Sequence, residues 1–582
     1  MLRSCCIGMG LLFATHVWAG ECHLESYGTL PVEMVGNQAT TMVKINGQST
    51  RFILDTGAFF NIMSAANAAA LGLRLQPAPF GYRVSGIGGS ANIQQAHVKE
   101  FGILDTTLKN VDFIVGGSDA GNGLLGANLL DIADLEIDLA HGKLTLFKAE
   151  HCDNTSLAYW VKDDKYNLAD IERSPNRFDR RTFVNVTING RKVRALIDSG
   201  AAATVLFREA AERIGIDVSA RDVKSGFTSF GVGGRPVHSW TVNIDSFSVG
   251  SETIQHSQMQ VLDGSTNDGT DMLLGVDFLL AHHMFIATSK GKVYFTYNGG
   301  RVFTYAQAPG DDGKAMTDTN AASPKSAADA AMLGQAHLSR GEAHAAVADL
   351  DEAIRMAPGQ ADYYVIRARA FQADMQPEAA AADLDTALSL QPRQVDALLM
   401  RARLRLAHKD RAGAASDAAT ASAAVTAGST QARAVASLYI QLDQPASALP
   451  LLDDWIRLHG DDAMLGAALN ERCWARALSN QMLDDALKDC RKAIRRDGQN
   501  PAYLDSLGLV QLRLGQYPDA IKAYRQSLAE KPDTAWSRYG LGLAEIRAGQ
   551  ADAGQADLVA ARALDPHIET QAAGFGLTAS GP

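Results

Sequence analysis

The sequence has no long hydrophobic run after its first twenty residues, no cluster of basic residues and no metal-ligand motif. The first shortage matters because a membrane-spanning helix needs ~18 uncharged apolar residues. With a formal net charge of −11 and no Lys/Arg cluster for phosphate contacts, we expect no nucleic-acid partner. His282 and His283 are adjacent rather than one helical turn apart, and no Cys/His group has ligand spacing, so we expect no metal.

The sequence also lacks a nucleotide-binding loop and the motifs of a Ser-His-Asp site. Gly86-x-Gly88 is not followed by the Lys-Ser/Thr of a nucleotide loop, and no βαβ pattern surrounds it. His97 and His238 have no nucleophile motif to complete a Ser-His-Asp arrangement. We therefore expect no cofactor and no serine-type chemistry.

The first nineteen residues have the form of a signal peptide. Met1–Ala19 contains one basic residue, Arg3, then an apolar stretch, and Val17 and Ala19 suit cleavage before Gly20. We expect cleavage after Ala19 and export to a bacterial periplasm or the exterior, with no membrane contact afterwards. Because one positive charge makes a weak n-region for a signal peptide, an uncleaved membrane anchor stays open as an alternative.

Four cysteines remain after that cleavage, and an even number in an exported chain permits disulfides. Cys22 and Cys152 bracket the first β-rich unit, where a bond between them would contribute on the order of 4 kcal/mol. The alternative is two unpaired cysteines near its edges. Cys473 and Cys490 fall where two facing helices touch, either bonded or as small apolar core residues.

One series of four landmarks occurs twice. Each copy has a strand-like run, an Asn-Gly turn, a second run ending at an aspartate, a Gly-rich stretch and Leu-Leu-Gly. The offsets between copies are 143 for the turns, 143 for Asp55 and Asp198, 145 for the Gly-rich stretches and 149 for Leu-Leu-Gly. Four landmarks at nearly one offset indicate an internal duplication. We also expect helices over 61–71 and 204–214, because both are rich in helix formers and stop at Gly.

The C-terminal part of the chain has a different, helical composition with a period of 34 residues. Pro358 and Pro392 lie 34 apart, as do Pro532 and Pro566, and each is expected to end the second helix of a pair. Small residues recur at two fixed places before each Pro: Gly334, Ala368, Gly508 and Gly542, and Ala346, Ala380, Ala520 and Gly554. This pattern resembles tetratricopeptide repeats. We count about seven, with a slip of four residues near 463–466.

These features divide the chain into seven parts: a signal peptide (1–19), lobe 1 (27–149), a charged connector (150–178), lobe 2 (179–306), a flexible linker (307–326), the repeats (327–567) and a tail (568–582). Asp-Thr/Ser-Gly-Ala after an apolar strand, then a Gly-rich hairpin and Leu-Leu-Gly, resembles the retropepsin-like aspartic proteases in both lobes. The fold this implies is two all-β retropepsin-like barrel lobes with a pepsin-like pseudo-twofold, followed by an all-α tetratricopeptide solenoid.

The resemblance also assigns roles to residues. Asp55 and Asp198 become the catalytic pair, and Thr56 and Ser199 the hydroxyls that cross-brace the loops formed with Gly57, Ala58, Gly200 and Ala201. Gly86, Ile87, Gly88 and Gly89, with Gly231, Val232, Gly233 and Gly234, become substrate-binding flap tips, and Gly126 and Gly275 pack under the aspartate loops. The implied activity is that of an endopeptidase on protein or peptide substrates, with a protein partner in the groove of the repeats.

Physical chemistry supports the same interpretation. Two carboxylates about 3 Å apart cannot both ionise, so one holds a proton while the other activates water. Since both aspartates lie on one chain, we expect one site between the lobes. Two alternatives stay open: a site made by dimerisation of one lobe, and a noncatalytic periplasmic scaffold that only binds peptides.

Overall fold

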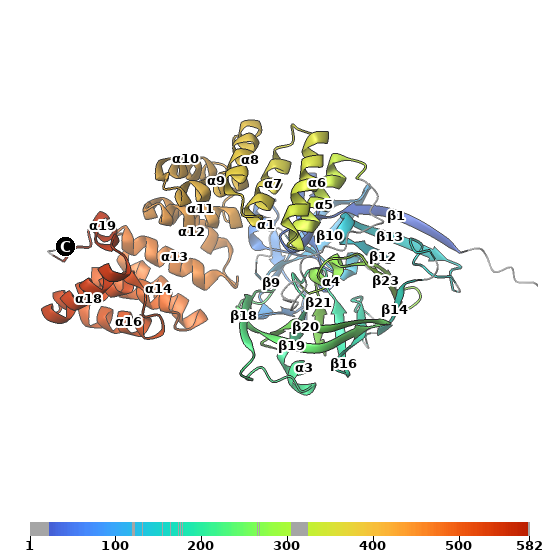
Figure 1. The fold of residues 1–582 in the computed structure, drawn as a ribbon, viewed down its shortest axis with the longest axis horizontal. Helices are drawn as coiled ribbons and strands as arrows, with labels where there is room; N and C mark the ends of the chain where they lie inside the picture. The colour runs from blue at the N-terminus through green and yellow to red at the C-terminus, as the bar shows by residue number, and fades with distance from the viewer. Residues whose placement is uncertain are drawn as a thin grey trace, which may run out of the picture.

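The computed structural model describes residues 22–118, 123–130, 132–153, 155–162, 165–172, 174, 176, 178–264, 266, 268–303 and 324–579. The expected signal peptide (1–19) and nearly all of the expected linker (307–326) lie outside these residues. Figure 1 shows a β-rich part, coloured blue to green, and an arc of helices coloured yellow to red. The predicted fold class, two β-rich lobes followed by a helical solenoid, is confirmed.

Both Asn-Gly turns close a hairpin, and the second strand of each hairpin ends at one of the two aspartates. In lobe 1 the turn joins β3 (Gln38–Ile45) to β4 (Gln48–Leu54), and in lobe 2 it joins β15 (Phe183–Ile188) to β16 (Arg191–Ile197). Each turn starts at an Asn with φ of 49°, the left-handed region that Asn and Gly tolerate. Both predicted hairpins are confirmed.

Each hairpin belongs to a larger sheet. The sheet of lobe 1 has the order β2-β3-β4-β11-β5-β10-β9-β6, and that of lobe 2 continues as β15-β16-β21-β17-β20-β19-β18. The remaining strands of lobe 1 are β2 (Glu33–Val35), β5 (Ile62–Met63), β6 (Leu75–Pro77), β9 (Ile93–Ile103), β10 (Thr106–Gly116) and β11 (Leu124–Leu125). Those of lobe 2 are β17 (Val205–Phe207), β18 (Lys224–Ser229), β19 (Val237–Val249), β20 (Glu252–Leu262) and β21 (Met272–Leu274).

Six strands form a seam between the lobes: β1 (His23–Pro31), β13 (Lys143–Glu150), β12 (Asp134–Asp138), β22 (His282–Ala287), β23 (Lys292–Tyr297) and β14 (Asn167–Glu172). At its centre β12 of lobe 1 pairs antiparallel with β22 of lobe 2, Leu135 opposite Ile286 and Ile137 opposite Met284. With an offset of 149 residues, Leu135 lies opposite the counterpart of Ile137, and Ile137 lies opposite the counterpart of Leu135. That exchange is what a twofold axis through the seam produces. One cluster of buried side chains, including Phe52, Ile137, Ile286 and Phe278, runs through both lobes.

The helices after the aspartate loops are shorter than the sequence suggested. A short strand precedes each of them: β5 before α1 (Ala65–Ala70) and β17 before α3 (Arg208–Arg213). Ile62 and Val205 are buried and pair with β11 and β21, a position that suits β-branched side chains better than a helix does. The prediction that helix begins at residues 61 and 204 was therefore wrong. The expected connector 150–178 also contains an ordered strand, β14.

Fourteen helices between residues 327 and 564 form seven antiparallel pairs (Figure 1). They are α5 (Ala327–Ser339), α6 (Ala343–Met356), α7 (Ala361–Ala373), α8 (Pro377–Leu390), α9 (Val395–Ala407), α10 (Arg411–Ser422), α11 (Thr430–Gln441), α12 (Pro445–Leu458), α13 (Leu465–Leu478), α14 (Leu483–Asp497), α15 (Pro501–Arg513), α16 (Tyr517–Glu530), α17 (Ala535–Arg547) and α18 (Ala551–Leu564). A short α19 (Ile568–Gly574) follows. Within the part of the chain that the structure describes, none of the helices is long and apolar enough to cross a membrane.

The small residues of the repeat pattern lie where paired helices approach most closely. A methyl group added at Gly542 would lie 2.8 Å from the carbonyl oxygen of Gly554 on the facing helix. Pro358 stands two residues after the end of α6, so the proline ends the second helix of its pair. The solenoid, here called the arm (324–579), also packs on lobe 1, where the Ser339 hydroxyl donates to Gly36 O at 2.6 Å.

All four cysteines of the described residues are paired. Cys22 and Cys152 tie the start of β1 to the end of β13, and Cys473 and Cys490 join α13 to α14. The first bond spans 130 residues and the second only 17. Of the two alternatives left open by the sequence, the bonded one is present in both cases.

The double variant C22S/C152S tests the first bond. We expect the free energy of unfolding of the lobes to fall by about 4 kcal/mol, because the open loop of the unfolded chain regains its entropy. Guanidinium unfolding followed by hydrogen exchange in lobe peptides measures it. C473S/C490S serves as the control, since its bond lies in the arm. Equal lobe stability in both variants would contradict the expectation.

Candidate active site

Both aspartates stand at the carboxyl end of an inner strand, and the neighbouring strand fixes their backbone. The N–H of Asp55 donates to Leu125 O and that of Asp198 to Leu274 O, each at 2.9 Å. These acceptors belong to the two Leu-Leu-Gly triplets, whose strands run parallel to β4 and β16. The fourth landmark of the duplication, Leu-Leu-Gly, therefore belongs to the strand that holds the aspartate.

Each carboxylate is oriented by the turn that follows it. Asp55 Oδ1 accepts the N–H groups of Gly57 and Ala58 at 3.0 and 2.8 Å. Asp198 Oδ1 accepts those of Gly200 and Ala201 at 2.9 and 3.0 Å. The second oxygen of each carboxylate accepts no such bond from its turn, so it can face the other lobe.

The two carboxyl groups lie against one another across the seam. A methyl group added at Gly57 would lie 2.3 Å from Cγ of Asp198, and one added at Gly200 would lie 2.3 Å from Cγ of Asp55. Only glycine therefore fits at either place, because any side chain would displace the opposite aspartate. Residues 143 positions apart in the sequence are neighbours in space, as the single-site interpretation requires.

Thr56 and Ser199 join the two loops through four buried hydrogen bonds. The Thr56 hydroxyl donates to Ile197 O at 2.8 Å and accepts the N–H of Ser199 at 3.0 Å. The Ser199 hydroxyl donates to Leu54 O at 2.7 Å and accepts the N–H of Thr56 at 3.1 Å. Each hydroxyl both donates and accepts across the seam, so neither loop can shift alone.

Burial and mutual contact control the ionisation of the aspartates. Burial raises the pKa of Asp55 well above its ordinary value, and the neighbouring charge of Asp198 raises it further, against the opposing N–H bond from Ala58. Burial also raises the pKa of Asp198, while the Gly200 N–H and the positive charge of Arg181 oppose that rise. The pair therefore holds a proton at a pH where an exposed aspartate would be ionised.

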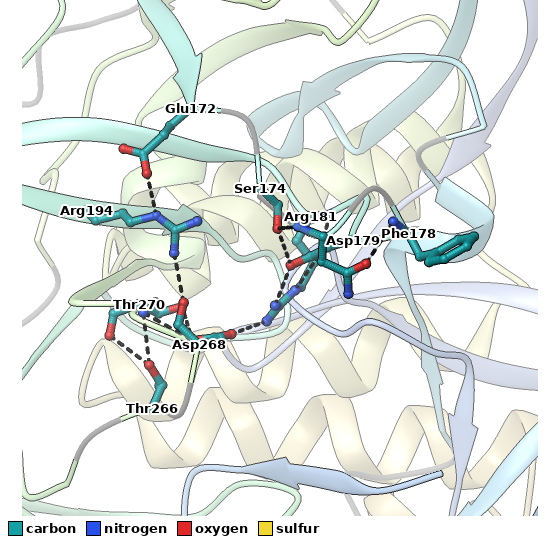
Figure 2. A network of polar contacts seen from close by, with 10 residues as sticks. Glu172, Ser174, Phe178, Asp179, Arg181, Arg194, Thr266, Asp268 and Thr270 are labelled. Atoms are coloured by element: carbon teal, nitrogen blue, oxygen red, sulfur yellow. Dashed lines mark hydrogen bonds and ion pairs between the residues drawn. The ribbon is translucent and has the colours of Figure 1, made fainter. Parts of the chain in front are cut away.

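The positive charge beside Asp198 has no counterpart in lobe 1. Arg181 forms ion pairs with Asp179 and Asp268, both at 2.8 Å, and Figure 2 shows Asp268 between Arg181 and Arg194. Arg194 in turn lies over the Phe183 ring, 3.6 Å from its centroid. The residue of lobe 1 that corresponds to Arg181, 143 positions earlier, is Gln38. The duplication has therefore left the two aspartates in different electrostatic surroundings.

Two residues that the sequence analysis did not select support the aspartate loops from below. Asn61 Oδ1 accepts the N–H of Gly126 at 2.9 Å, and Thr204 Oγ1 accepts that of Gly275 at 3.0 Å. Asn61 and Thr204 are themselves 143 residues apart, so the duplication carried a signal for them. A methyl group at Gly126 or Gly275 would lie 2.5 or 2.4 Å from the backbone of the loop above, as expected for close packing there.

The two Gly-rich stretches meet over the aspartates. The first is the turn of a hairpin formed by β7 (Val84–Gly86) and β8 (Gly89–Ala91), and the second joins β18 to β19. The Gly233 N–H donates to Ile87 O at 2.9 Å. A methyl group at Gly233 would lie 2.1 Å from the carbonyl carbon of Gly88, so glycine is required where the tips cross.

Each tip places its apolar side chain in the opposite lobe. Ile87 of lobe 1 packs on the lobe 2 cluster of Phe183, Leu196, Val205, Phe207, Leu262 and Leu273, beside Ala201 of the aspartate loop. Val232 of lobe 2 packs on the lobe 1 cluster of Ile53, Ile62, Val84, Ile114 and Leu124, beside Ala58. The apolar clusters beside the aspartate loops are thus covered by the chain itself, an exchange that the sequence did not reveal.

Two paired aspartate loops on a pseudo-twofold axis, covered by glycine-rich flaps, define the class of aspartic proteases. The families matched agree: residues 41–131 match the gag-polyprotein aspartyl protease family and residues 184–278 the aspartyl protease family. Residues 506–567 match the tetratricopeptide repeat family. The chain contains two retropepsin-like aspartyl-protease domains in tandem, followed by tetratricopeptide repeats.

Curated relatives share only a short segment with this chain. This chain is 32% identical over 126 residues to DNA damage-inducible protein 1 of Cryptococcus neoformans, and the match covers 20% of this chain and 26% of that protein. It is 36% identical over 115 residues to UBA domain-containing protein Mud1 of Schizosaccharomyces pombe, covering 19% and 32%. Protein DDI1 homolog 1 of Homo sapiens is 27% identical over 143 residues, covering 24% and 34%. The chain thus spans about a quarter to a third of these relatives.

Two of the similar solved structures are tetratricopeptide repeat proteins. YrrB, a TPR protein with an unusual peptide-binding site, is 20% identical and covers 32% of this chain and 95% of its own, with a TM-score of 0.28. A tetratricopeptide repeat protein from Parabacteroides merdae is 15% identical and covers 43% and 98%, with a TM-score of 0.32.

Loss of the Thr56 hydroxyl tests the brace between the loops. T56A leaves the Ile197 carbonyl and the Ser199 N–H buried without their partner, so we expect it to lower the free energy of unfolding of the lobes by about 2–4 kcal/mol. T56S keeps the hydroxyl and is the matched control, with a loss expected below about 1 kcal/mol. Urea unfolding measures both. Equal stability of T56A and T56S would show that the brace carries little energy.

The raised pKa of Asp55 predicts how stability depends on pH. Because the folded state holds its proton more tightly than the unfolded state, the resulting stabilisation is complete below the ordinary pKa of 3.8 and is lost as pH rises through the folded value. D55N should therefore be more stable than the parent at pH 7, and this advantage should shrink as pH falls toward 4. Each unit of raised pKa corresponds to about 1.4 kcal/mol.

Chemical unfolding at a series of pH values measures this dependence. D217N is the control of opposite sign, because the Ser219 hydroxyl and N–H lower the pKa of the exposed Asp217. An advantage of D55N that does not change with pH would contradict a shared proton on the pair.

Proposed function

We propose that the chain is an exported aspartic endopeptidase with a single active site between its lobes, formed by Asp55 and Asp198. The observation behind the proposal is that each carboxyl group lies against the other loop's glycine and that the two carboxyl groups are hydrogen-bonded to each other. The reciprocal hydrogen bonds of Thr56 and Ser199 support it, because they hold the carboxyl groups in fixed relative positions.

The proposed reaction uses a water molecule held between the carboxyl groups. The ionised carboxylate takes a proton from this water as it attacks the peptide carbonyl. The protonated carboxyl donates to the developing oxyanion and then helps the amine leave. The asymmetry of the surroundings favours Asp198 as the ionised member, since Arg181 is on its side and Asp55 has the more strongly raised pKa.

The substrate we propose is an extended polypeptide lying between the aspartates and the flaps. Ile87 and Val232 would leave the apolar clusters beside Ala201 and Ala58 as the flaps lift, making room for apolar substrate side chains. Tetratricopeptide repeats form surfaces that bind proteins, so we propose that the arm recruits a protein partner or the substrate itself. The repeat-protein neighbour with a described peptide-binding site is of this class.

We also propose export to a periplasm or the exterior. Its support is the signal-like start of the sequence together with the two disulfide bonds, which persist in oxidising compartments.

The single variants D55N and D198N test the shared site. In a chain shown to be monomeric by light scattering, each should lower cleavage of an unfolded protein at acidic pH roughly a thousandfold or more, because neither lobe has a complete dyad alone. D217N is the control, and a statyl-type inhibitor should block the parent. Full activity in either single variant would contradict one shared site. An inert parent that still captures a partner through the arm would favour the noncatalytic scaffold.

A further inference from the structure

The outer side of the crossed flaps is in contact with the arm. The loop between α12 and α13, residues 459–464, here called the latch loop, reaches the glycine-rich tips together with Arg496 of α14. In Figure 1 the orange helices of this region lie beside the β-rich part near β9 and β18. Residues more than 200 positions apart in the sequence meet at this place.

The latch loop contacts both flaps. Asn92, at the end of the first flap hairpin, donates from Nδ2 to Oδ2 of Asp461 at 3.1 Å. The Ala463 N–H donates to the Ser118 hydroxyl at 2.9 Å, and that hydroxyl donates to Gly233 O of the second flap at 2.9 Å. One short loop of the arm therefore fixes positions on both sides of the pseudo-twofold axis.

Arg496 connects the second flap to the latch loop. Its Nη2 donates to Gly234 O at 2.5 Å and to Asp462 O at 2.6 Å. A methyl group at Gly234 would lie 2.7 Å from Asp461 O, so the flap backbone lies directly on the loop. A guanidinium shared between two carbonyl oxygens is a charged donor, and such bonds are stronger than those between neutral groups.

The latch loop coincides with the irregularity of the repeat period. The 34-residue pattern slips by four residues near 463–466, immediately at this loop. The loop has six residues, whereas four residues separate the corresponding helices at 357–360, 391–394 and 531–534. The junction between α10 and α11, residues 423–429, is longer still at seven residues. Length alone therefore does not distinguish the latch loop; its contacts with the flaps do.

We propose that Arg496 and the latch loop position the flaps over the aspartates, so that the arm is part of the gate of the active site. The proposal rests on the proposed function, in which the flaps lift to admit a polypeptide. Lifting the second flap breaks the bonds to Gly233 and Gly234, and lifting the first strains the Asn92–Asp461 bond. The latch therefore favours the closed arrangement, in which Ile87 and Val232 pack on the apolar clusters of the opposite lobes.

The variants R496A and N92A test the latch in the full-length chain. Hydrogen exchange of the flap segments 84–91 and 230–236 should become about tenfold faster in R496A, since the open state gains population when the charged donor is lost. N92A should have a smaller effect, largest in 84–91. R496K, which retains a charged donor, should restore part of the protection. R495A, an exposed arginine one position away on α14, is the matched control and should leave exchange unchanged.

Enzyme kinetics give a second measurement. Binding of a statyl-type inhibitor should be faster in R496A, and the rise in kcat/KM for a peptide should exceed any change in kcat, because entry rather than chemistry is altered. Unchanged flap exchange in both R496A and N92A, with the arm folded by circular dichroism, would overturn the proposal. If the R496A substitution disturbs the fold of the arm, flap exchange in N92A and S118A tests the proposal instead, because Asn92 and Ser118 belong to the lobes. Exchange needs no substrate, so an inactive parent would refute the proposed function and still leave the latch tested.

Discussion

The close approach of the two aspartate loops is the constraint on which the rest of the structure depends. Gly57 and Gly200 leave room for the opposite carboxyl group, because a side chain on either glycine would overlap it. Thr56 and Ser199 hold that arrangement with four buried hydrogen bonds. Burial at this place raises the pKa of both aspartates, and the charge of Asp198 raises the pKa of Asp55 further, so the same packing makes the pair hold a proton. The packing of the two loops therefore sets both the geometry of the aspartates and their protonation.

The duplication supplied two similar halves, and the structure shows where they have become different. The central strands β12 and β22 still pair as a twofold axis requires. Arg181 lies beside Asp198 and not beside Asp55, and of the two flaps it is the second to which the latch residue Arg496 donates. A single chain can carry such differences, whereas two identical chains around a symmetric site cannot. These differences between the halves give each aspartate and each flap its own surroundings.

The sequence predicted the parts of the site that the duplication repeats. The Asn-Gly turns, the aspartates and the Gly-rich stretches were found because each occurs twice at nearly one offset, and Asn61 and Thr204 carried the same signal unnoticed. The strands β5 and β17 were missed because two or three residues before a helix-forming run have no periodicity of their own. The crossing of Ile87 and Val232 between lobes, and the contact of Asp461 with Asn92, join distant segments. No local pattern encodes such contacts; only the slip near 463–466 marked the place.

The central claim is that one chain contains one complete active site. The most direct measurement is the stoichiometry of a tightly bound statyl-type inhibitor, titrated by calorimetry into chain shown by sedimentation to be monomeric. A single site between the lobes requires one inhibitor per chain, because both carboxyl groups of the site come from the same molecule. One inhibitor per two chains, with dimers forming on binding, would contradict it.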